Sequence, residues 1–307
     1  MPKGIVLSNI SDLYKVEVNN KIFDCRARGK FKNNEISPVS GDFVEIEITD
    51  ETKFEGVIIK IEERENYIKR PKMANITQLI LVVSMKLPKP DLELLDKQLV
   101  YAEYMKIKPI ICLNKMDLDD DKIADDIQTL YEKIGYTVIK TDAKQGIGVK
   151  EIKKYLKNNI TAFSGNSGVG KSTLLNCLLG EEISEEGLIS EKNQRGKNTT
   201  TQVTLYKIEE NSYLADTPGF STFSIDEIDS KDLSYYFIEF RNFLKDCEYL
   251  DCSHVKEEKC GIKKAVEEGK ISKERYDRYV SLIQNKEKRD SPFLGKKGKK
   301  DLSLFRR

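Results

Sequence analysis

The sequence predicts a multidomain fold: an N-terminal β-barrel, a central α/β domain and a mainly helical C-terminal domain. Two changes in residue pattern support this division. Short alternating segments end near residue 65, and an alternation of strands and helices runs from residue 77 to about residue 220. The length of 307 residues also exceeds one typical domain of roughly 150 residues. We expect domains at residues 1–65, 66–222 and 223–307.

The first 65 residues contain five short segments in which apolar and polar residues alternate, and turns with Asn, Gly or Pro separate them. Five short strands at this spacing predict a small barrel of the oligonucleotide-binding type, the OB-fold. The segments span residues 4–10, 13–20, 21–29, 41–49 and 54–63.

One edge of this barrel carries alternating basic residues, with Phe23 and Phe31 nearby. Basic side chains that follow a phosphate backbone, together with aromatic rings that stack on bases, are typical of barrels that bind RNA. A solvated strand face accounts for the same pattern, and both interpretations stay open. The candidate RNA-binding residues are Arg26, Arg28, Lys30 and Lys32.

The central region begins with a continuous apolar run at residues 77–85, which is typical of a parallel strand covered on both faces. Segments of helical spacing then alternate with further apolar strands. This alternation predicts a nucleotide-binding α/β sheet. The expected helices are 91–106, 121–135 and 149–158, and the expected strands after the first are 109–115, 136–143 and 160–163.

The segment "GNSGVGKS" follows the last of these strands, precedes a helix and matches the pattern G-x-x-x-x-G-K-S. The glycines of this pattern let backbone N–H groups surround phosphates, Lys171 reaches the β and γ oxygens, and the Ser172 hydroxyl ligates Mg²⁺. The segment therefore predicts a phosphate loop. Its expected nucleotide-binding residues are Gly165, Asn166, Ser167, Gly168, Val169, Gly170, Lys171, Ser172 and Thr173.

Two further segments suit the γ-phosphate end of such a site. In "DTPGF", Asp216 stands at a strand end, where it can hold Mg²⁺ through water, and the N–H of Gly219 can meet the γ-phosphate. An ordinary Pro-Gly turn is the alternative, which the upstream phosphate loop makes weaker. The polar segment 192–206 predicts a mobile switch. We favour Thr200 as its Mg²⁺ ligand, although Thr199 and Thr201 stay open.

The segment "NKMD" ends the strand 109–115 and is a candidate for guanine recognition. Asp117 can accept two hydrogen bonds from guanine that adenine cannot return, while Asn114 and Lys115 fix the loop and cover the ring. Alone this quartet is a weak match. It gains support from its place at a strand end, where such sheets bind ligands. In "TDAKQG", Ala143 and Lys144 stand as in the second guanine-contacting loop of GTPases.

The order of these motifs differs from that of most GTPases, in which the phosphate loop and switches come first. Here both guanine loops precede the phosphate loop, so the order is a circular permutation. The helix 149–158, which would ordinarily finish the fold, leads into the strand that would begin it. Contacts survive such rejoining because domain termini often lie close together. Whatever follows the second switch is then directly coupled to the nucleotide state.

The C-terminal segment contains three cysteines and the single histidine within fourteen residues, "CEYLDCSHVKEEKC". Such grouping indicates metal ligands and not a disulfide framework. Three thiolates and one imidazole supply a closed tetrahedral Zn²⁺ site, which leaves no position for a reactive water. We expect a structural zinc held by Cys247, Cys252, His254 and Cys260; a free cysteine group is the alternative.

Together, "NKMD", "TDAK", "GNSGVGKS", "TTT" and "DTPGF", between a barrel and a Cys/His segment, resemble the circularly permuted bacterial GTPases that act on the small ribosomal subunit, the ribosome small subunit-dependent GTPase A family. The resemblance spans nearly the whole chain, including "CRARGKFK" and "SPVSGDFVEI". It implies a GTPase that uses GTP and Mg²⁺, helps late maturation of the small subunit near its decoding region, and is stimulated by that subunit.

The residues that orient the attacking water depart from known patterns. Phe220 stands where Ras-like enzymes place a glutamine, and a phenyl ring cannot orient water. Asn198 stands where the family typically has a histidine, and an amide cannot serve as a general base. We expect slow intrinsic hydrolysis, on the order of 10⁻⁴ s⁻¹, which a partner can raise by about 10³- to 10⁵-fold. Arg195 and Lys197 either stabilise charge, contact rRNA or merely solubilise the loop.

The composition limits the possible partners and location. With 52 basic and 51 acidic residues the chain is not a polycation, so any nucleic-acid surface is local. The N-terminus does not resemble a signal peptide, and no apolar run approaches the roughly 20 residues that span a bilayer. We expect a cytoplasmic monomer whose partners are the small ribosomal subunit, its rRNA and other assembly factors. The alternative is a GTP-binding RNA or ribosome assembly module with negligible turnover.

Overall fold

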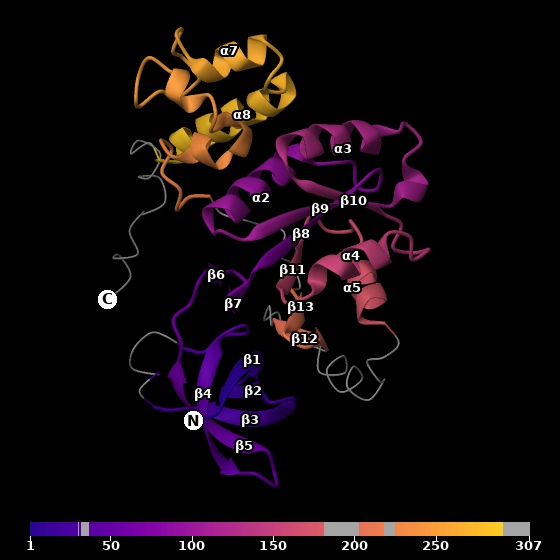
Figure 1. Ribbon diagram of the computed structural model, residues 1–307, viewed down its shortest axis with the longest axis vertical. Coiled ribbons are helices and arrows are strands. Elements are labelled where there is room, and N and C mark those ends of the chain that lie inside the picture. Colours follow the sequence, from indigo (N-terminus) through magenta and orange to yellow (C-terminus); the bar gives the residue numbers. More distant parts are fainter. Residues whose placement is uncertain (30, 32–36, 181–202, 218–224, 291–307) are drawn as a thin grey trace, which may run out of the picture. The chain divides into compact units, whose positions relative to one another are not determined.

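The computed structural model describes residues 1–29, 31, 37–180, 203–217 and 225–290 (Figure 1). By their contacts the residues fall into two compact units. The first consists of Met1–Asp91 and Met105–Thr222, and the second of Leu92–Tyr104 and Phe223–Arg307. Among the described residues, none of the helices has the length and apolarity that a membrane span requires.

The N-terminal strands form the closed barrel that the sequence predicts, in the order β1-β2-β3-β5-β4. Successive side chains of a strand point to opposite faces, so Val16 and Val18 of β2 lie in the barrel core with Phe23 of β3. All neighbours are antiparallel except β3 and β5. The strands are β1 (Lys3–Ile10), β2 (Leu13–Val18), β3 (Lys21–Ala27), β4 (Phe43–Asp50) and β5 (Glu55–Ile61).

A two-stranded hairpin, β6 (Tyr67–Lys69) and β7 (Lys72–Ala74), follows the barrel in sequence. The sequence did not predict it, because three residues are too few to display the two-residue period of a strand. The central sheet comes next.

In the described part of the chain the central sheet has six strands in the order β10-β9-β8-β11-β13-β12, and all are parallel except the edge strand β12. Every residue of β8 is buried, as its apolar run predicts. The strands are β8 (Gln78–Ser84), β9 (Lys108–Asn114), β10 (Thr137–Thr141), β11 (Ile160–Ser164), β12 (Thr204–Glu209) and β13 (Ser212–Asp216).

Strand β12 corrects one sequence prediction. Residues 192–206 were expected to form a mobile switch, but Thr204 to Tyr206 belong to this strand and pair with β13. Most side chains of β12 are only half-buried, so an apolar run does not mark the strand. Residues 181–202 lie outside the described part of the chain.

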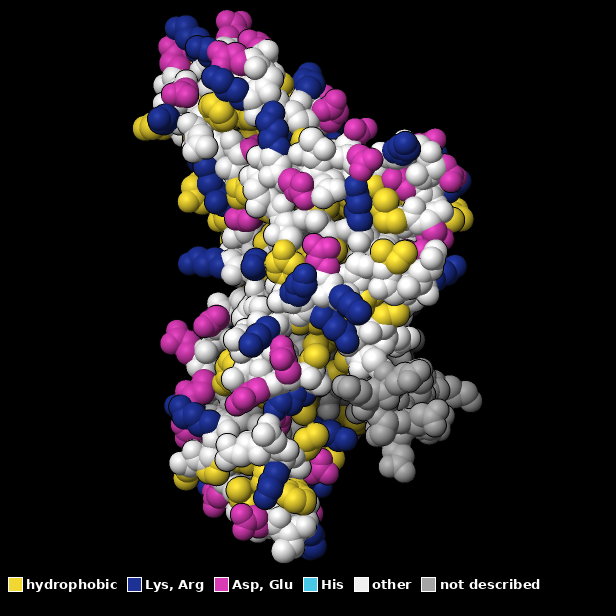
Figure 2. Space-filling view, turned by 45° about the vertical axis from the view of Figure 1, so that its right-hand side comes forward, with side chains coloured by type: hydrophobic (Ala, Val, Ile, Leu, Met, Phe, Trp, Pro, Cys, Tyr) yellow, Lys and Arg dark blue, Asp and Glu magenta, His cyan; other side chains and the backbone are white. Residues whose placement is uncertain are grey.

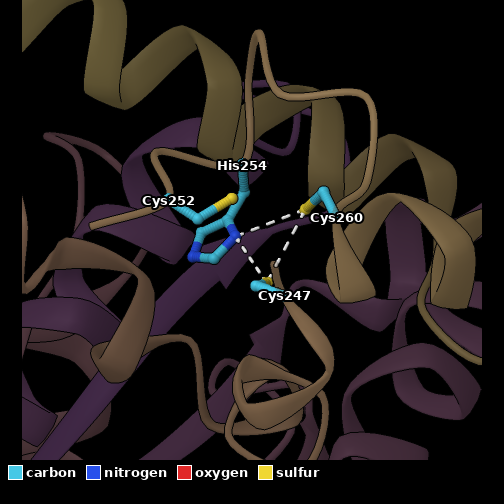
Figure 3. Close-up of side chains that lie close together, drawn as sticks. All are labelled: Cys247, Cys252, His254 and Cys260. Atoms are coloured by element: carbon cyan, nitrogen blue, oxygen red, sulfur yellow. Dashed lines mark hydrogen bonds between the residues drawn. The ribbon is translucent and has the colours of Figure 1, made fainter. Parts of the chain in front are cut away.

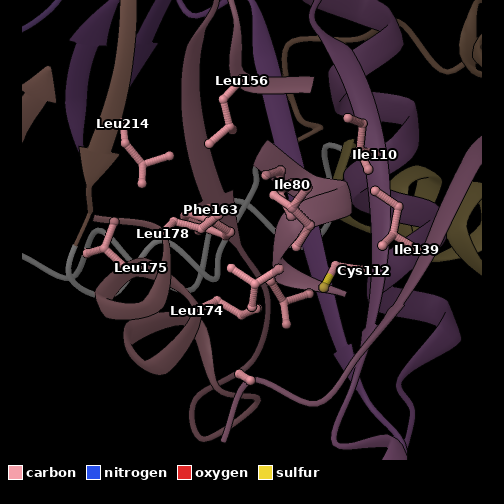
Figure 4. Close-up of a cluster of buried hydrophobic side chains, with 14 of the residues drawn as sticks. Ile80, Ile110, Cys112, Ile139, Leu156, Phe163, Leu174, Leu175, Leu178 and Leu214 are labelled. Atoms are coloured by element: carbon pink, nitrogen blue, oxygen red, sulfur yellow. The ribbon is translucent and has the colours of Figure 1, made fainter. Parts of the chain in front are cut away.

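Helices α3 (Ile123–Ile134), α4 (Val149–Leu156) and α5 (Lys171–Leu179) belong to the same unit as the sheet. Leu156 of α4 and Leu174 of α5 pack with Phe163 and Leu214 from the middle strands in one buried cluster (Figure 4). This cluster fixes α5, and therefore the loop before it, against the carboxyl end of β11.

The second unit is mainly helical, as predicted. It contains α7 (Gly261–Glu267), α8 (Lys273–Asp290) and the 3₁₀ turns η2 (Leu233–Tyr236), η3 (Ile238–Phe240) and η4 (Leu244–Asp246). It also contains α2 (Leu92–Tyr104), whose Val100 lies in the hydrophobic cluster of this unit. This grouping differs from the continuous domain at residues 66–222 that the sequence predicts.

A buried ionic network explains why α2 belongs to the second unit. Arg275 of α8 is fully buried and donates hydrogen bonds to the carboxylates of Asp96 on α2 and Glu239 on η3. Arg278 donates to Asp96 as well. The Arg275 guanidinium also lies 4.9 Å from the ring centroid of Phe237. A buried guanidinium needs such partners, because an unpaired buried charge is strongly destabilising.

Replacing Asp96 with Ala leaves Arg275 without one of its carboxylates. We expect the second unit to lose about 3 to 5 kcal/mol of stability, the usual cost of breaking a buried ion pair. Hydrogen exchange across residues 273–290 should therefore become much faster. The control is Asp277→Ala, which removes only the exposed pair with Lys273. Unchanged exchange in the Asp96 variant would contradict this account.

Candidate functional site

The predicted phosphate loop connects β11 to α5 and is built around glycines. Gly165 and Gly170 have φ values of +143° and +102°, which other residues rarely adopt. A Cβ on Gly165 would lie 2.3 Å from the Val82 carbonyl oxygen, and one on Gly170 would lie 2.2 Å from Asn114 Nδ2. The loop therefore packs so closely on its neighbours that only glycine fits at these two positions.

The first turn of α5 presents the groups that phosphate binding requires. Ser172 and Thr173 are exposed at its start, where the helix has N–H groups without intrahelical partners. The Lys171 ammonium donates to the carbonyl oxygens of Gly165 and Asn166 at 2.7 and 2.8 Å. Burial lowers the pKa of Lys171. Its charge thus lies within the loop, where it can neutralise phosphate oxygens.

Asn114, at the end of β9, connects three loops through one side chain. Its Nδ2 donates to the Val169 carbonyl oxygen of the phosphate loop at 2.8 Å. Its Oδ1 accepts from the Thr141 hydroxyl at 2.9 Å and from the Ala143 N–H at 3.2 Å. The sheet therefore brings the "NKMD" loop, the "TDAK" loop and the phosphate loop together, as the sequence predicts.

The two expected guanine loops present different groups to solvent. Asp117 is exposed in the 3₁₀ turn η1 (Met116–Leu118), and Lys144 is exposed after β10. The Lys115 ammonium donates to the carbonyl oxygens of Leu87 and of Gly168 in the phosphate loop. The side chain of Lys115 thus links the guanine loop to the phosphate loop, which the sequence did not reveal.

Asp216 ends β13, next to β11 in the sheet, so its carboxylate stands at the same edge as the phosphate loop. The hydroxyl of Thr217 donates to the Phe163 carbonyl oxygen at 3.2 Å, which holds the start of the "DTPGF" turn against β11. Several predicted residues lie outside the described part of the chain: Lys30, Lys32, Arg195, Lys197, Asn198, Thr199, Thr200, Thr201, Gly219 and Phe220.

The predicted zinc ligands lie together in the second unit. Their ligand atoms are all within 4.8 Å of one another. Nδ1 of His254 lies 3.5 Å from Cys247 Sγ and 3.4 Å from Cys260 Sγ, and the two sulfurs are 4.0 Å apart (Figure 3). Tetrahedral Zn²⁺ with bonds of about 2.3 Å to sulfur and 2.0 Å to nitrogen needs edges of roughly 3.5 to 3.8 Å. The four residues therefore fit zinc.

Burial shifts the pKa values of two of these ligands in opposite directions. It raises the pKa of the Cys252 thiol to about 12 and lowers the pKa of His254. The imidazole is therefore neutral at pH 7 and ready to bind, whereas a cation that binds must displace the thiol proton.

Glu257 shapes the turn that carries two of the ligands. Its carboxylate accepts hydrogen bonds from the N–H and hydroxyl of Ser253 at 2.9 and 2.8 Å, and from the N–H groups of Val255 and Lys256 at 3.1 and 3.2 Å. These bonds span His254, whose φ of +60° is unusual for a histidine. Glu257 follows the histidine by three residues in the sequence, but an acidic residue at that spacing does not by itself indicate a role at a metal site.

The barrel edge expected to contact RNA has both exposed and buried members among the described residues. Arg26 and Arg28 are exposed on and just after β3, and Arg28 pairs with Glu47 at 3.2 Å. Phe23, however, is 3% exposed in the barrel core and is not available for stacking. Phe54 is 40% exposed, and the ammonium of Lys21 lies 5.8 Å from its centroid. Basic and acidic side chains are interspersed on the face in Figure 2.

Comparisons with known proteins cover almost the whole chain. The family model described as RsgA GTPase matches residues 61–226, and that described as RsgA N-terminal domain matches residues 3–58. Proteins named small ribosomal subunit biogenesis GTPase RsgA are 41% identical in Alkaliphilus metalliredigens and 43% identical in Clostridium botulinum. Both alignments cover 92% of this chain, and 97% and 96% of the relatives.

Two solved structures are similar as well. YjeQ from Thermotoga maritima has a TM-score of 0.80 at 37% identity, covering 92% of this chain and 98% of that one. YloQ, described as a circularly permuted GTPase, has a TM-score of 0.79 at 34% identity, covering 94% and 96%. The permuted order of the motifs is therefore confirmed.

Changing Asp117 to Asn should reverse the recognition of the base. The amide presents a donor to the guanine N–H groups, so we expect GTP affinity to fall on the order of 100-fold or more, while xanthine nucleotide binds better. Titrations of fluorescent GTP and XTP measure both. Asp121→Asn, an exposed change in the same loop, is the control. Unchanged guanine preference would remove Asp117 from this role.

Changing Glu257 to Gln should weaken zinc binding without touching a ligand. In the wild type the carboxylate accepts hydrogen bonds from backbone N–H groups. In the variant an amide nitrogen, itself a donor, faces some of these groups, so the turn around His254 loosens. We expect zinc affinity to fall by about 10- to 100-fold, as for other residues that orient metal ligands. Competition with a chromophoric chelator measures it. Glu258→Gln, the exposed neighbouring change, should keep the wild-type affinity; equal affinity in both variants would refute the role.

Proposed function

This chain belongs to the RsgA GTPase family and is a GTP hydrolase, and we propose that it acts on the small ribosomal subunit during its late maturation. Relatives that cover nearly all of the chain carry the name small ribosomal subunit biogenesis GTPase. The main support for nucleotide binding is the hydrogen bond from Asn114 to the Val169 carbonyl oxygen. It holds the loop proposed to recognise guanine beside the phosphate loop, so that both can contact one nucleotide.

We propose that separate loops of the central domain bind the base and the phosphates of GTP. Asp117 accepts the hydrogen bonds of guanine, and Lys115 covers the ring while Asn114 holds the loops. Ala143 and Lys144 complete the base site. The phosphate loop, Gly165 to Thr173, surrounds the phosphates, with Lys171 on the β and γ oxygens. The N–H of Gly219 meets the γ-phosphate.

The family uses Mg²⁺, and the residues at the edge of the sheet fit it. Ser172 has an exposed hydroxyl at the start of α5, and Asp216 ends the neighbouring strand β13. Bound there with Thr200, the ion would neutralise charge on the phosphates. The chain's own contribution is to orient GTP and to exclude water other than the attacking one. With Phe220 and Asn198 in place of the usual polar groups, we propose that the subunit completes the arrangement around that water.

We propose that the flanking parts of the chain provide the grip on the subunit. Arg26 and Arg28 on the barrel, with Lys30 and Lys32, contact rRNA phosphates, and the exposed ring of Phe54 offers a stacking surface. The zinc segment is a rigid second contact. In this proposal the protein is a cytoplasmic monomer with domains at residues 1–65, 66–222 and 223–307, except that α2 belongs to the C-terminal unit. Other assembly factors are further partners, and hydrolysis releases the protein from the subunit.

The decisive measurement is GTP turnover with and without purified small subunits. We expect the subunit to raise turnover by about 10³-fold or more, because it supplies groups that the free protein lacks. Purified large subunits serve as the control and should have little effect. Equal rates with and without small subunits would rule out the stimulated enzyme.

Phe220 and Asn198 favour a second candidate, an assembly module in which GTP sets the conformation and turnover is negligible. For this module we expect the affinity for the subunit to be the same with GTP as with a nonhydrolysable analogue, and to stay constant during the incubation. The proposed enzyme instead leaves the subunit as GTP is consumed. The same preparation therefore separates the two functions.

A further inference from the structure

Glu17 is buried at a place where a barrel residue should be exposed. In β2 the side chains of Tyr14, Val16 and Val18 lie in the barrel core. Because side chains alternate along a strand, Glu17 points away from that core. It is nevertheless only 7% exposed. A carboxylate on the outside of a small barrel is ordinarily solvated, so its burial requires partners from elsewhere in the chain.

Those partners come from the β12–β13 hairpin of the central sheet. The Lys207 ammonium donates to one oxygen of Glu17, and the Tyr213 hydroxyl donates to the other at 3.1 Å. Lys207 and Tyr213 stand directly opposite each other in the two strands, so both reach Glu17 from one face. Lys207 also donates to Asn20 Oδ1 at 2.6 Å. Burial first, and then the charge of Glu17, raise the pKa of Tyr213, which keeps its hydroxyl a donor.

A second contact lies at the start of the same hairpin. The buried hydroxyl of Ser40 donates to the Val203 carbonyl oxygen at 2.8 Å, and Val203 immediately precedes β12. Asp216, the candidate Mg²⁺ residue, ends β13 and pairs with Thr204, the residue after Val203, so it lies at the same end of the hairpin. The barrel therefore contacts the hairpin near both of its strands, and the hairpin ends at the nucleotide site.

We propose that Glu17 is a positioning residue: through its bonds to Lys207 and Tyr213, the barrel holds the β12–β13 hairpin in place. A buried carboxylate that loses either donor is strongly destabilised, so Glu17, Lys207 and Tyr213 move together. A shift of Asp216 on nucleotide exchange is thereby transmitted to β2, and a partner bound to the barrel acts on Asp216 by the same contacts, since such coupling is reciprocal. The effect of a partner rests on the proposed function; the effect of the nucleotide does not.

The first experiment measures hydrogen exchange of the full chain with GDP and with a nonhydrolysable GTP analogue. In the wild type we expect exchange in residues 13–18 to differ between the two nucleotides. In Glu17→Gln this difference should be lost, because the amide puts a donor toward Lys207 or Tyr213, while protection of residues 165–173 by nucleotide remains. That protection shows that the variant is folded and has nucleotide bound.

The matched control is Glu51→Gln, which makes the same charge change at an exposed turn between β4 and β5. It should keep the wild-type difference. Tyr213→Phe removes one hydrogen bond but keeps the ring, and it should reduce the difference partially. The inference is overturned if the wild type shows no difference in residues 13–18, or if Glu17→Gln shows the same difference as Glu51→Gln.

The second experiment compares GTP turnover with small subunits. We expect stimulation of Glu17→Gln to fall by about fivefold or more relative to the wild type and Glu51→Gln, in the range of typical coupling between sites. If the wild type is stimulated and Glu17→Gln is stimulated equally, the partner part of the inference is wrong. If the wild type is not stimulated, the proposed function fails, and the exchange experiment alone decides whether Glu17 couples the barrel to the nucleotide.

Discussion

The candidate nucleotide site depends on the amide of Asn114, because this amide sets the distance between the loop proposed to recognise the base and the loop proposed to hold the phosphates. Its donor and acceptor are both used, by Val169 and by Thr141 with Ala143. The close approach explains why residue 170 is a glycine. These bonds connect the carboxyl ends of parallel strands. They therefore do not depend on the order in which the chain visits the strands, and a permuted chain can keep them.

The permutation changes what the site is attached to. The chain reaches β12 and β13 last of the strands in this sheet. Strand β12 forms one edge of the sheet, and its partner β13 ends at Asp216. The N-terminal barrel contacts this hairpin through Glu17 and Ser40. The last two strands of the sheet, β12 and β13, are thus held by the N-terminal barrel, which comes first in the chain. In an unpermuted order, with the phosphate loop first, the same hairpin would come early in the domain sequence.

Much of the fold and of the site could be predicted because the signals are local. The buried run of β8, the helical spacing of α3 and the glycine pattern before α5 each lie within a short window. The remainder depends on pairings between distant residues. Glu17 alternates like any exposed strand residue, Phe23 resembles a stacking ring until the barrel closes on it, and Asp96 does not reveal Arg275. Strand β12 was missed because half-buried polar residues carry no clear period.

Helix α2 shows how a discontinuous unit must be assembled during synthesis. Its sequence leaves the ribosome between β8 and β9, whereas its partners on η3 and α8 are made after the whole central sheet. Domains generally fold from the N-terminus onward as they are made. The sheet can therefore form around a helix whose Val100 and Asp96 still lack their final neighbours. Completion of the nucleotide-binding part precedes completion of the unit that contains α2. Helix α8, the last helix among the described residues, completes both the hydrophobic cluster and the ionic network.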